Sequence, residues 1–119
     1  MENNDEQQKT EKIIFSDDPR TLKVRGGTDS VKKPTDPTKL SMAILHVLSE
    51  HEYVKILTVG PVALNIAMKA FRLAAVEAEK ITNGAVLVCR QSEYAATIGG
   101  SKTKGVCTRI FAIPITSAL

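Results

Sequence analysis

The chain has 119 residues, enough for one domain around one hydrophobic core but too few for two separate cores. Hydrophobic residues make up 43% and charged residues 24%, as in ordinary globular proteins, and no apolar stretch reaches the roughly 18 residues of a membrane span. The polar opening MENNDEQQKTEK is unlike a signal peptide, and two cysteines without framework spacing fit a reducing compartment, so we expect a cytoplasmic protein.

Charge divides the chain unevenly. Residues 1–20 hold six acidic and three basic residues, a net charge of −3, whereas residues 21–119 hold thirteen basic and seven acidic residues, a net charge of +6. A basic body indicates a polyanionic partner, although a surface charged only for solubility explains the charge equally well.

The first 20 residues are expected to form a flexible acidic extension, ahead of a folded domain over residues 21–119. Their one apolar cluster, Ile13–Phe15, is open to three interpretations: an added strand, a contact for a partner, or a sticky patch on a frayed terminus.

Hydrophobic periodicity and turn residues predict the next elements. In chain order they are a strand over Leu22–Arg25, a loop, a helix over Lys39–Glu50 capped by Thr38, a strand over Tyr53–Val59 and a helix over Val62–Ile81 that begins after Gly60-Pro61.

The second helix is apolar on two sides. One stripe is formed by Leu64, Met68, Phe71, Ala75 and Ala78, and the other by Val62, Ile66, Leu73 and Val76. One side can face a sheet, so the other side needs a neighbouring helix or a second subunit.

The last third is typical of a β-hairpin, with strands over Ala85–Tyr94 and Val106–Ile115. The segment between them, ATIGGSKTKG, is expected to be a flexible loop because it is too long for a two-residue turn. Pro114 indicates that the last strand ends at a sheet edge. The predicted order is β-α-β-α-β-β, an α+β fold.

Catalysis is not expected. His46 and His51 are five residues apart on one helix, and the sequence has no pattern of metal ligands. Cys89 and Cys107 lie in strands without a neighbouring base. The segment GGSKT resembles a phosphate-binding loop, but no glycine directly precedes its lysine and a strand, not a helix, follows it. We therefore expect no enzyme activity, metal, cofactor or small-molecule substrate.

Three places are candidates for binding an anion. Lys102 and Lys104 lie at the glycine-rich tip of the hairpin, where they can reach phosphates. Lys32 and Lys33 lie in the loop before the first helix. Asn65 interrupts the apolar surface of the second helix, and on the residues alone a structural hydrogen bond explains it better than a contact to a ligand.

The order and spacing of these segments resemble the bacterial stage V sporulation protein S family. The clearest match is the strand–Gly–helix block GPVALNIAMKA, and the hairpin AVLVCRQSEY with CTRIFAIP agrees with it. The likeness covers about residues 22–115. The loop GGTDSVKKPTDP is longer than in those relatives, and the acidic extension lies outside the domain.

The resemblance implies an Alba-like fold, in which a four-stranded mixed sheet carries two helices on one face, and it implies a homodimer. It also implies that nucleic acid binds at the loop after the first strand, the start of the second helix and the hairpin. In this sequence those positions are Lys32, Lys33, Asn65, Lys69, Lys102 and Lys104.

Two functions from different classes follow. The first is a dimeric nucleic-acid-binding protein of low sequence specificity, in a chromatin-like or regulatory role, because no helix carries the Arg, Asn and Gln set that reads bases in the major groove. The second is a protein-interaction module of a regulatory complex, with Ile13–Phe15 as its hook and the acidic extension able to cover the basic face.

Overall fold

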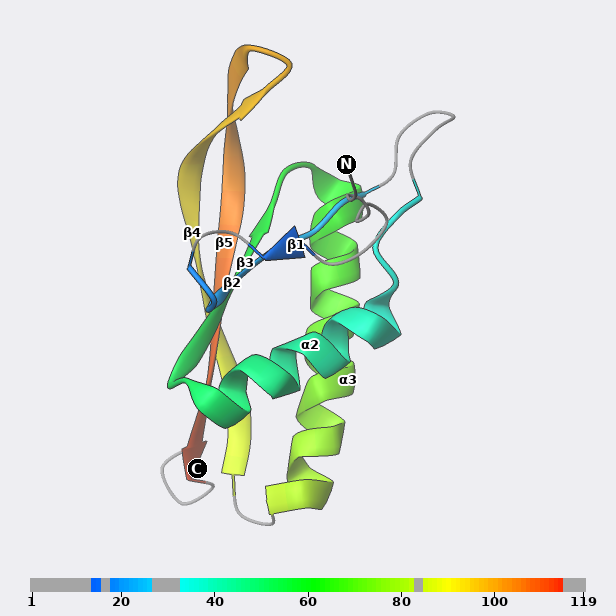
Figure 1. The fold of residues 1–119 in the computed structure, drawn as a ribbon, viewed down its shortest axis with the longest axis vertical. Coiled ribbons are helices and arrows are strands. Elements are labelled where there is room, and N and C mark those ends of the chain that lie inside the picture. Colours follow the sequence, from blue (N-terminus) through cyan, green and yellow to red (C-terminus); the bar gives the residue numbers. More distant parts are fainter. Residues whose placement is uncertain (1–13, 16–17, 27–32, 83–84, 115–119) are drawn as a thin grey trace, which may run out of the picture.

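The computed structural model describes residues 14–15, 18–26, 33–82 and 85–114 of the chain. Its elements follow in chain order (Figure 1). They are β1 (Ile14–Phe15), β2 (Thr21–Lys23), α2 (Pro37–Glu50), β3 (Tyr53–Thr58), α3 (Pro61–Thr82), β4 (Ala85–Ile98) and β5 (Ser101–Pro114).

The strands form one mixed sheet in the order β1-β2-β3-β5-β4. β2 and β3 are parallel, whereas the β3–β5 and β4–β5 pairs are antiparallel. The predicted four-stranded mixed sheet with two helices on one face is therefore confirmed (Figure 1). The two-residue β1 adds an antiparallel strand to the edge of β2, so part of the Ile13–Phe15 cluster extends the sheet, while Ile13 itself lies outside the described residues.

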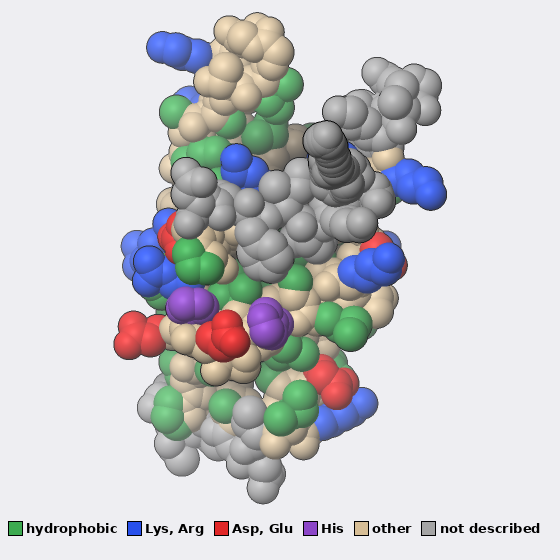
Figure 2. Space-filling model, viewed as in Figure 1, with side chains coloured by type: hydrophobic (Ala, Val, Ile, Leu, Met, Phe, Trp, Pro, Cys, Tyr) green, Lys and Arg blue, Asp and Glu red, His purple; other side chains and the backbone are tan. Residues whose placement is uncertain are grey.

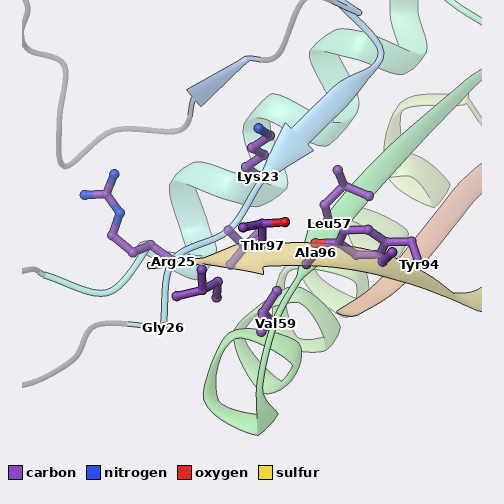
Figure 3. Close-up of a pocket in the computed structure, with 11 residues that line it drawn as sticks. Lys23, Arg25, Gly26, Leu57, Val59, Tyr94, Ala96 and Thr97 are labelled. Carbon is purple, nitrogen blue, oxygen red and sulfur yellow. The ribbon is translucent and has the colours of Figure 1, made fainter. Parts of the chain in front are cut away.

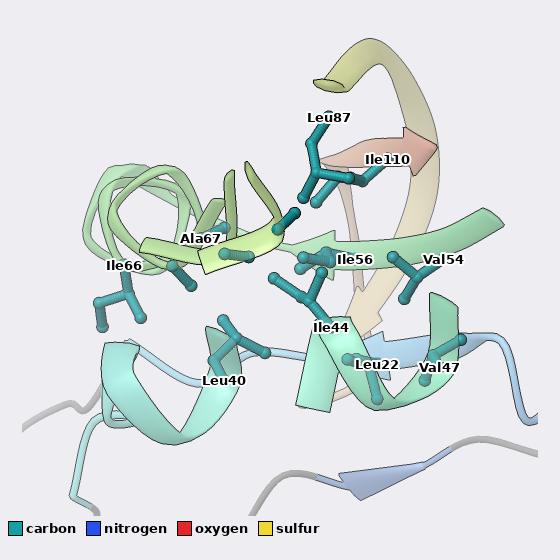
Figure 4. Close-up of a cluster of buried hydrophobic side chains, with 13 residues drawn as sticks. Leu22, Leu40, Ile44, Val47, Val54, Ile56, Ile66, Ala67, Leu87 and Ile110 are labelled. Carbon is teal, nitrogen blue, oxygen red and sulfur yellow. The ribbon is translucent and has the colours of Figure 1, made fainter. Parts of the chain in front are cut away.

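The core lies between the sheet and both helices. Along β3 the side chains of Val54, Ile56 and Thr58 are buried, whereas those of the alternate residues are only half-buried. Ile110 of β5 lies opposite Val54 and is also fully buried (Figure 4). This alternation follows from the two-residue period of a strand, and it shows which sheet face the helices cover. We call the opposite face the open face.

The start of α2 differs from the prediction. Asp36, not Thr38, caps the helix: its carboxylate accepts a hydrogen bond from the Thr38 N–H at 2.9 Å. Pro37 then occupies the first turn, where its lack of an N–H costs nothing. The helix consequently begins two residues earlier than the predicted Lys39.

The burial of α3 also corrects the prediction. Its deepest residues are a row of alanines: Ala63, Ala67, Ala70, Ala74 and Ala78. Because these side chains are small, the backbone of α3 can approach its neighbours closely. The larger residues of the first predicted stripe flank this row and are half-buried. In the second stripe, Ile66 joins the core with residues of α2, whereas Val62, Leu73 and Val76 stay exposed.

The prediction that ATIGGSKTKG forms a flexible loop in the hairpin is wrong. β4 and β5 are each 14 residues long and pair from Ala85 opposite Pro114 to Ile98 opposite Ser101. A two-residue turn joins them, with Gly99 at φ 57° and Gly100 at φ 83°. Two consecutive residues with positive φ match the twist of an antiparallel hairpin, which explains the paired glycines.

The other boundaries differ by one or two residues from the prediction. β2 is Thr21–Lys23 rather than Leu22–Arg25, and β3 ends at Thr58. β5 is an interior strand, not an edge strand. Pro114 is nevertheless tolerated there, because pairing with β3 has already ended at Phe111.

Candidate nucleic-acid interface

The hairpin projects beyond the body of the molecule as an arm. Pairing of β5 with β3 begins at Val106, so the residues from Ala95 to Lys104 pair only with one another. We call this segment the arm; it forms one end of the molecule in Figure 1. Its side chains are exposed except that of the half-buried Ala96.

Lys102 and Lys104 lie on the arm as predicted, but within a paired strand rather than in a loop. Both are exposed, and being two residues apart they project to the same side of β5. Lys104 Nζ lies 3.7 Å from a carboxylate oxygen of Glu93, with both side chains more than two-thirds exposed. An exposed ion pair of this kind contributes little, so it leaves Lys104 able to exchange Glu93 for a phosphate.

The start of α3 and the segment after β2 lie toward the same end of the molecule as the arm (Figure 1). A Cβ atom on Gly26 would lie 3.1 Å from the Ala63 nitrogen, so the chain leaving β2 packs closely on the first turn of α3. Arg25 N–H donates to Thr35 Oγ1 at 2.9 Å, and Thr35 N–H donates to the Arg25 carbonyl at 2.8 Å. These two hydrogen bonds close the base of the connection that carries the predicted lysines.

The remaining predicted residues fall in different places. Lys33 is exposed just before Thr35, whereas Lys32 lies outside the described residues. Asn65 is exposed near the start of α3 and makes no side-chain hydrogen bond to another described residue. Its side chain is thus accessible at the surface of α3, and a contact to a ligand stays a prediction.

Lys69 lies apart from the arm. With Arg72 it borders a hollow of about 550 Å³ between α3 and the beginning of α2. Leu73, Val76 and Pro37 line the same hollow, so its walls are partly apolar. Lys69 is therefore a neighbour of the exposed apolar surface of α3 and not of the hairpin.

Charge is distributed unevenly over the surface in Figure 2. In that view Lys and Arg side chains lie at the end carrying the arm, across the middle and in the opposite half, while the visible Asp and Glu side chains of the described residues lie across the middle and the opposite half. A surface with this arrangement attracts anions toward the arm.

The open face carries basic residues beyond the six that were predicted to bind nucleic acid. Lys23, Arg25 and residues 94–98 of β4 enclose a groove of about 490 Å³ (Figure 3). A second hollow of about 570 Å³ adjoins it and adds Lys55 and Arg109. The two share Lys23, Leu57 and Tyr94, and we call them together the open-face groove.

An ion-pair network anchors the far end of this groove. Asp18 contacts Arg20 at 3.1 Å and Lys55 at 3.9 Å. Hydrogen bonds from the Arg20 backbone and side chain lower the pKa of Asp18, so its carboxylate stays ionised at neutral pH. The guanidinium groups of Arg20 and Arg109 lie 4.9 and 4.7 Å from the centre of the Tyr53 ring. These contacts fix several open-face cations in place.

No cluster of three metal-ligating side chains exists among the described residues, and neither of the two described helices combines the length and apolar content that a membrane crossing needs. No curated protein gives a significant match to the chain. The family model named Stage V sporulation protein S matches residues 22–112, which span β2 to most of β5 and so include both helices and the arm. The chain therefore belongs to the stage V sporulation protein S family, a family named for its link to sporulation.

Proposed function

We propose that this protein binds nucleic acid, DNA or RNA, with low sequence specificity and without catalysing a reaction, as a chromatin-like or regulatory factor. The observation that carries the proposal is the arm, which presents Lys102 and Lys104 clear of the body, at the end toward which the start of α3 also lies (Figure 1). Lysines reach phosphates without reading bases, which accounts for the low specificity.

A dimer is the second part of the proposal. Val62, Leu73 and Val76 are 56%, 46% and 56% exposed along α3, an unusual amount for three apolar side chains of one helix. Leu73 and Val76 are three residues apart, and Val62 lies about three turns before them on the same side. A second copy packed against this side of α3 would remove them from water.

The dimer is tested by sedimentation equilibrium of the full chain and of a Leu73→Glu variant. The proposal predicts a dimer that the buried carboxylate of the variant converts to a folded monomer. An original chain that stays monomeric at all concentrations would contradict it, as would a variant that stays dimeric.

Nucleic-acid binding is tested by fluorescence anisotropy with labelled duplex DNA, single-stranded DNA and duplex RNA at about 50 and 200 mM salt. A dimer with roughly six phosphate contacts should give a log–log salt slope near −5, from about −0.9 per contact. Absence of binding to every probe at low salt, from folded protein, would overturn the proposal. The protein-interaction module would then be the better account of the exposed side of α3.

A further inference from the structure

The second basic region of the molecule, the open-face groove, has chemistry that the arm lacks. Its walls carry Lys23, Arg25, Lys55 and Arg109 against one acidic residue, Asp18. Asp18 is already paired with Arg20 and Lys55. Lys23 and Arg25 form no ion pair with another described residue, so the groove keeps an excess of positive charge.

An aromatic ring lies where the two halves of the groove meet. Tyr94 lines both hollows and lies directly opposite Gly105 in the β4–β5 ladder. A Cβ atom on Gly105 would lie 2.5 Å from the Tyr94 ring, so the ring occupies the space of the missing side chain. The absence of a side chain at position 105 therefore lets the ring lie against β5.

The ring is also held at its far side. The Tyr94 hydroxyl lies 3.5 Å from the Thr58 carbonyl oxygen at the end of β3, so the side chain reaches across β5. Burial, with a smaller effect of Cys107, raises the pKa of Tyr94, and its hydroxyl stays protonated as a donor. The ring is thus preorganised: it is half-buried, lies against Gly105 and contacts the Thr58 carbonyl through its hydroxyl. It lies beside Leu57 and Ala96 in Figure 3, and it lines one hollow together with Lys23, Lys55 and Arg109.

A fixed aromatic ring in a basic groove is the combination that binds single-stranded nucleic acid. Cations follow the phosphates of the strand, and bases stack on the ring irrespective of their sequence. A duplex hides the faces of its bases within its own stack, so only unpaired bases can use such a ring. An acidic peptide would use the cations but would gain nothing from stacking.

From this arrangement we infer that the open-face groove is a binding site for single-stranded nucleic acid, with Tyr94 as the stacking residue and Lys23 and Arg109 as phosphate contacts. Ala95–Ile98 of the arm line part of this groove, whereas Lys102 and Lys104, which pair with Thr97 and Ala95 across the hairpin, do not line it. The inference rests on the proposed nucleic-acid binding but assigns the single-stranded form to a surface that Lys102 and Lys104 do not line.

The first test measures anisotropy of labelled oligo(dT) and oligo(U) of about 12 nucleotides with the full chain. Tyr94→Leu should weaken binding at least about five-fold, which corresponds to the roughly 1 kcal/mol at the lower end of the contribution of one stacked base. Tyr94→Phe keeps the ring and should stay within about two-fold of the original. Equal affinity of all three proteins would overturn the inference.

A second measurement does not depend on the stability of the leucine variant. The chain contains no tryptophan and two tyrosines, so in a Tyr53→Phe variant Tyr94 is the only strong fluorophore. Stacking of a base on Tyr94 should quench this emission as oligo(dT) is added. Binding seen by anisotropy without quenching would place the strand elsewhere and contradict the site.

Charge is tested with a matched pair of double variants. Lys23→Gln with Arg109→Gln should weaken oligo(dT) binding. The log–log salt slope of that binding should become shallower by the amount that corresponds to about two lost phosphate contacts. Lys39→Gln with Lys80→Gln removes the same charge from exposed positions on the helices and should leave binding to this site unchanged. Equal effects of the two double variants would show attraction by net charge alone and overturn the site.

The outcomes separate this inference from the proposed function. Duplex binding that persists, together with single-strand binding insensitive to Tyr94, contradicts the groove alone. Loss of all nucleic-acid binding contradicts both proposals. Binding of poly-glutamate as tightly as oligo(dT), equally in the original chain and in Tyr94→Leu, would assign the groove to acidic peptides instead.

Discussion

The β4–β5 hairpin has two halves that share one backbone ladder and differ in almost everything else. In the inner half, Leu87 and Ile110 are buried beneath the helices, and β3 pairs with the edge of β5 that does not face β4. In the arm, the strands pair only with each other and nearly every side chain is exposed. Side chains therefore stabilise the inner half, whereas backbone pairing and the turn maintain the arm, whose side chains are free to contact a ligand.

The largest expected effect comes from the inner half. Ile110→Ala removes a fully buried side chain and should lower the free energy of unfolding by about 2–5 kcal/mol, since the remaining cavity adds to the lost burial. Guanidinium unfolding followed by circular dichroism measures it. The matched control is Ile98→Ala in the arm, where the side chain is 55% exposed and the change should stay within about 0.5 kcal/mol. Similar losses in both variants would contradict the division between the halves.

Gly105→Ala tests the boundary between the halves. The new methyl group would meet the Tyr94 ring at 2.5 Å and the Thr58 carbonyl oxygen at 2.6 Å. Because the carbonyl belongs to the backbone and cannot turn away, we expect a loss of roughly 1–3 kcal/mol in the same unfolding experiment. Adding Tyr94→Leu should recover only part of that loss, because the contact with Thr58 remains. Complete recovery would show that the ring alone sets the limit.

The fold could be predicted because its elements are separated by strong sequence features. Gly60-Pro61 divides β3 from α3, and the alternation over Tyr53–Thr58 matches the buried and half-buried residues of β3. The arm was missed because Ala95–Ile98 and Ser101–Lys104 have no alternating apolar residues: nothing there is buried, so no burial pattern exists to read. The adjacent glycines at 99 and 100 were the available sign of a two-residue turn.

The candidate site was predictable only in part. Lys102 and Lys104 stand close to Gly99-Gly100 in the sequence, so their place on the hairpin could be read directly. The open-face groove joins residues from β2, β3, β4 and β5. Lys55 and Arg109 meet because register places them opposite each other, and register is a property of the assembled sheet. Of the alanine row of α3 the prediction named only Ala78, because helical spacing gives the apolar stripes but not which stripe packs most closely on its neighbours.

A smaller effect should follow from changing the turn. Gly99 has φ 57°, a conformation that Asn tolerates and a β-branched residue does not. Gly99→Val should therefore destabilise the arm locally by roughly 1–2 kcal/mol, while Gly99→Asn should be nearly neutral. Hydrogen exchange resolves the two halves: amides of the arm should exchange faster in the valine variant, and those near Ile110 should not change. Faster exchange throughout the hairpin would show that the halves unfold together.

The smallest effect on stability, and the most informative about function, is expected for Lys102→Gln with Lys104→Gln. Both side chains are exposed and the Lys104–Glu93 contact is a surface ion pair, so unfolding free energy should change by less than about 0.5 kcal/mol. The salt slope of duplex binding should become shallower by about 0.9 for each lost contact, or nearly 4 for a dimer with both arms engaged. Lys39→Gln with Lys80→Gln serves as the control of equal charge. If the arm variant keeps the original salt slope, the arm does not contact phosphates, and the exposed side chains of this half of the hairpin need another explanation. If its salt slope becomes shallower while the free energy of unfolding is unchanged, the inner half of the hairpin supplies stability and the arm supplies binding.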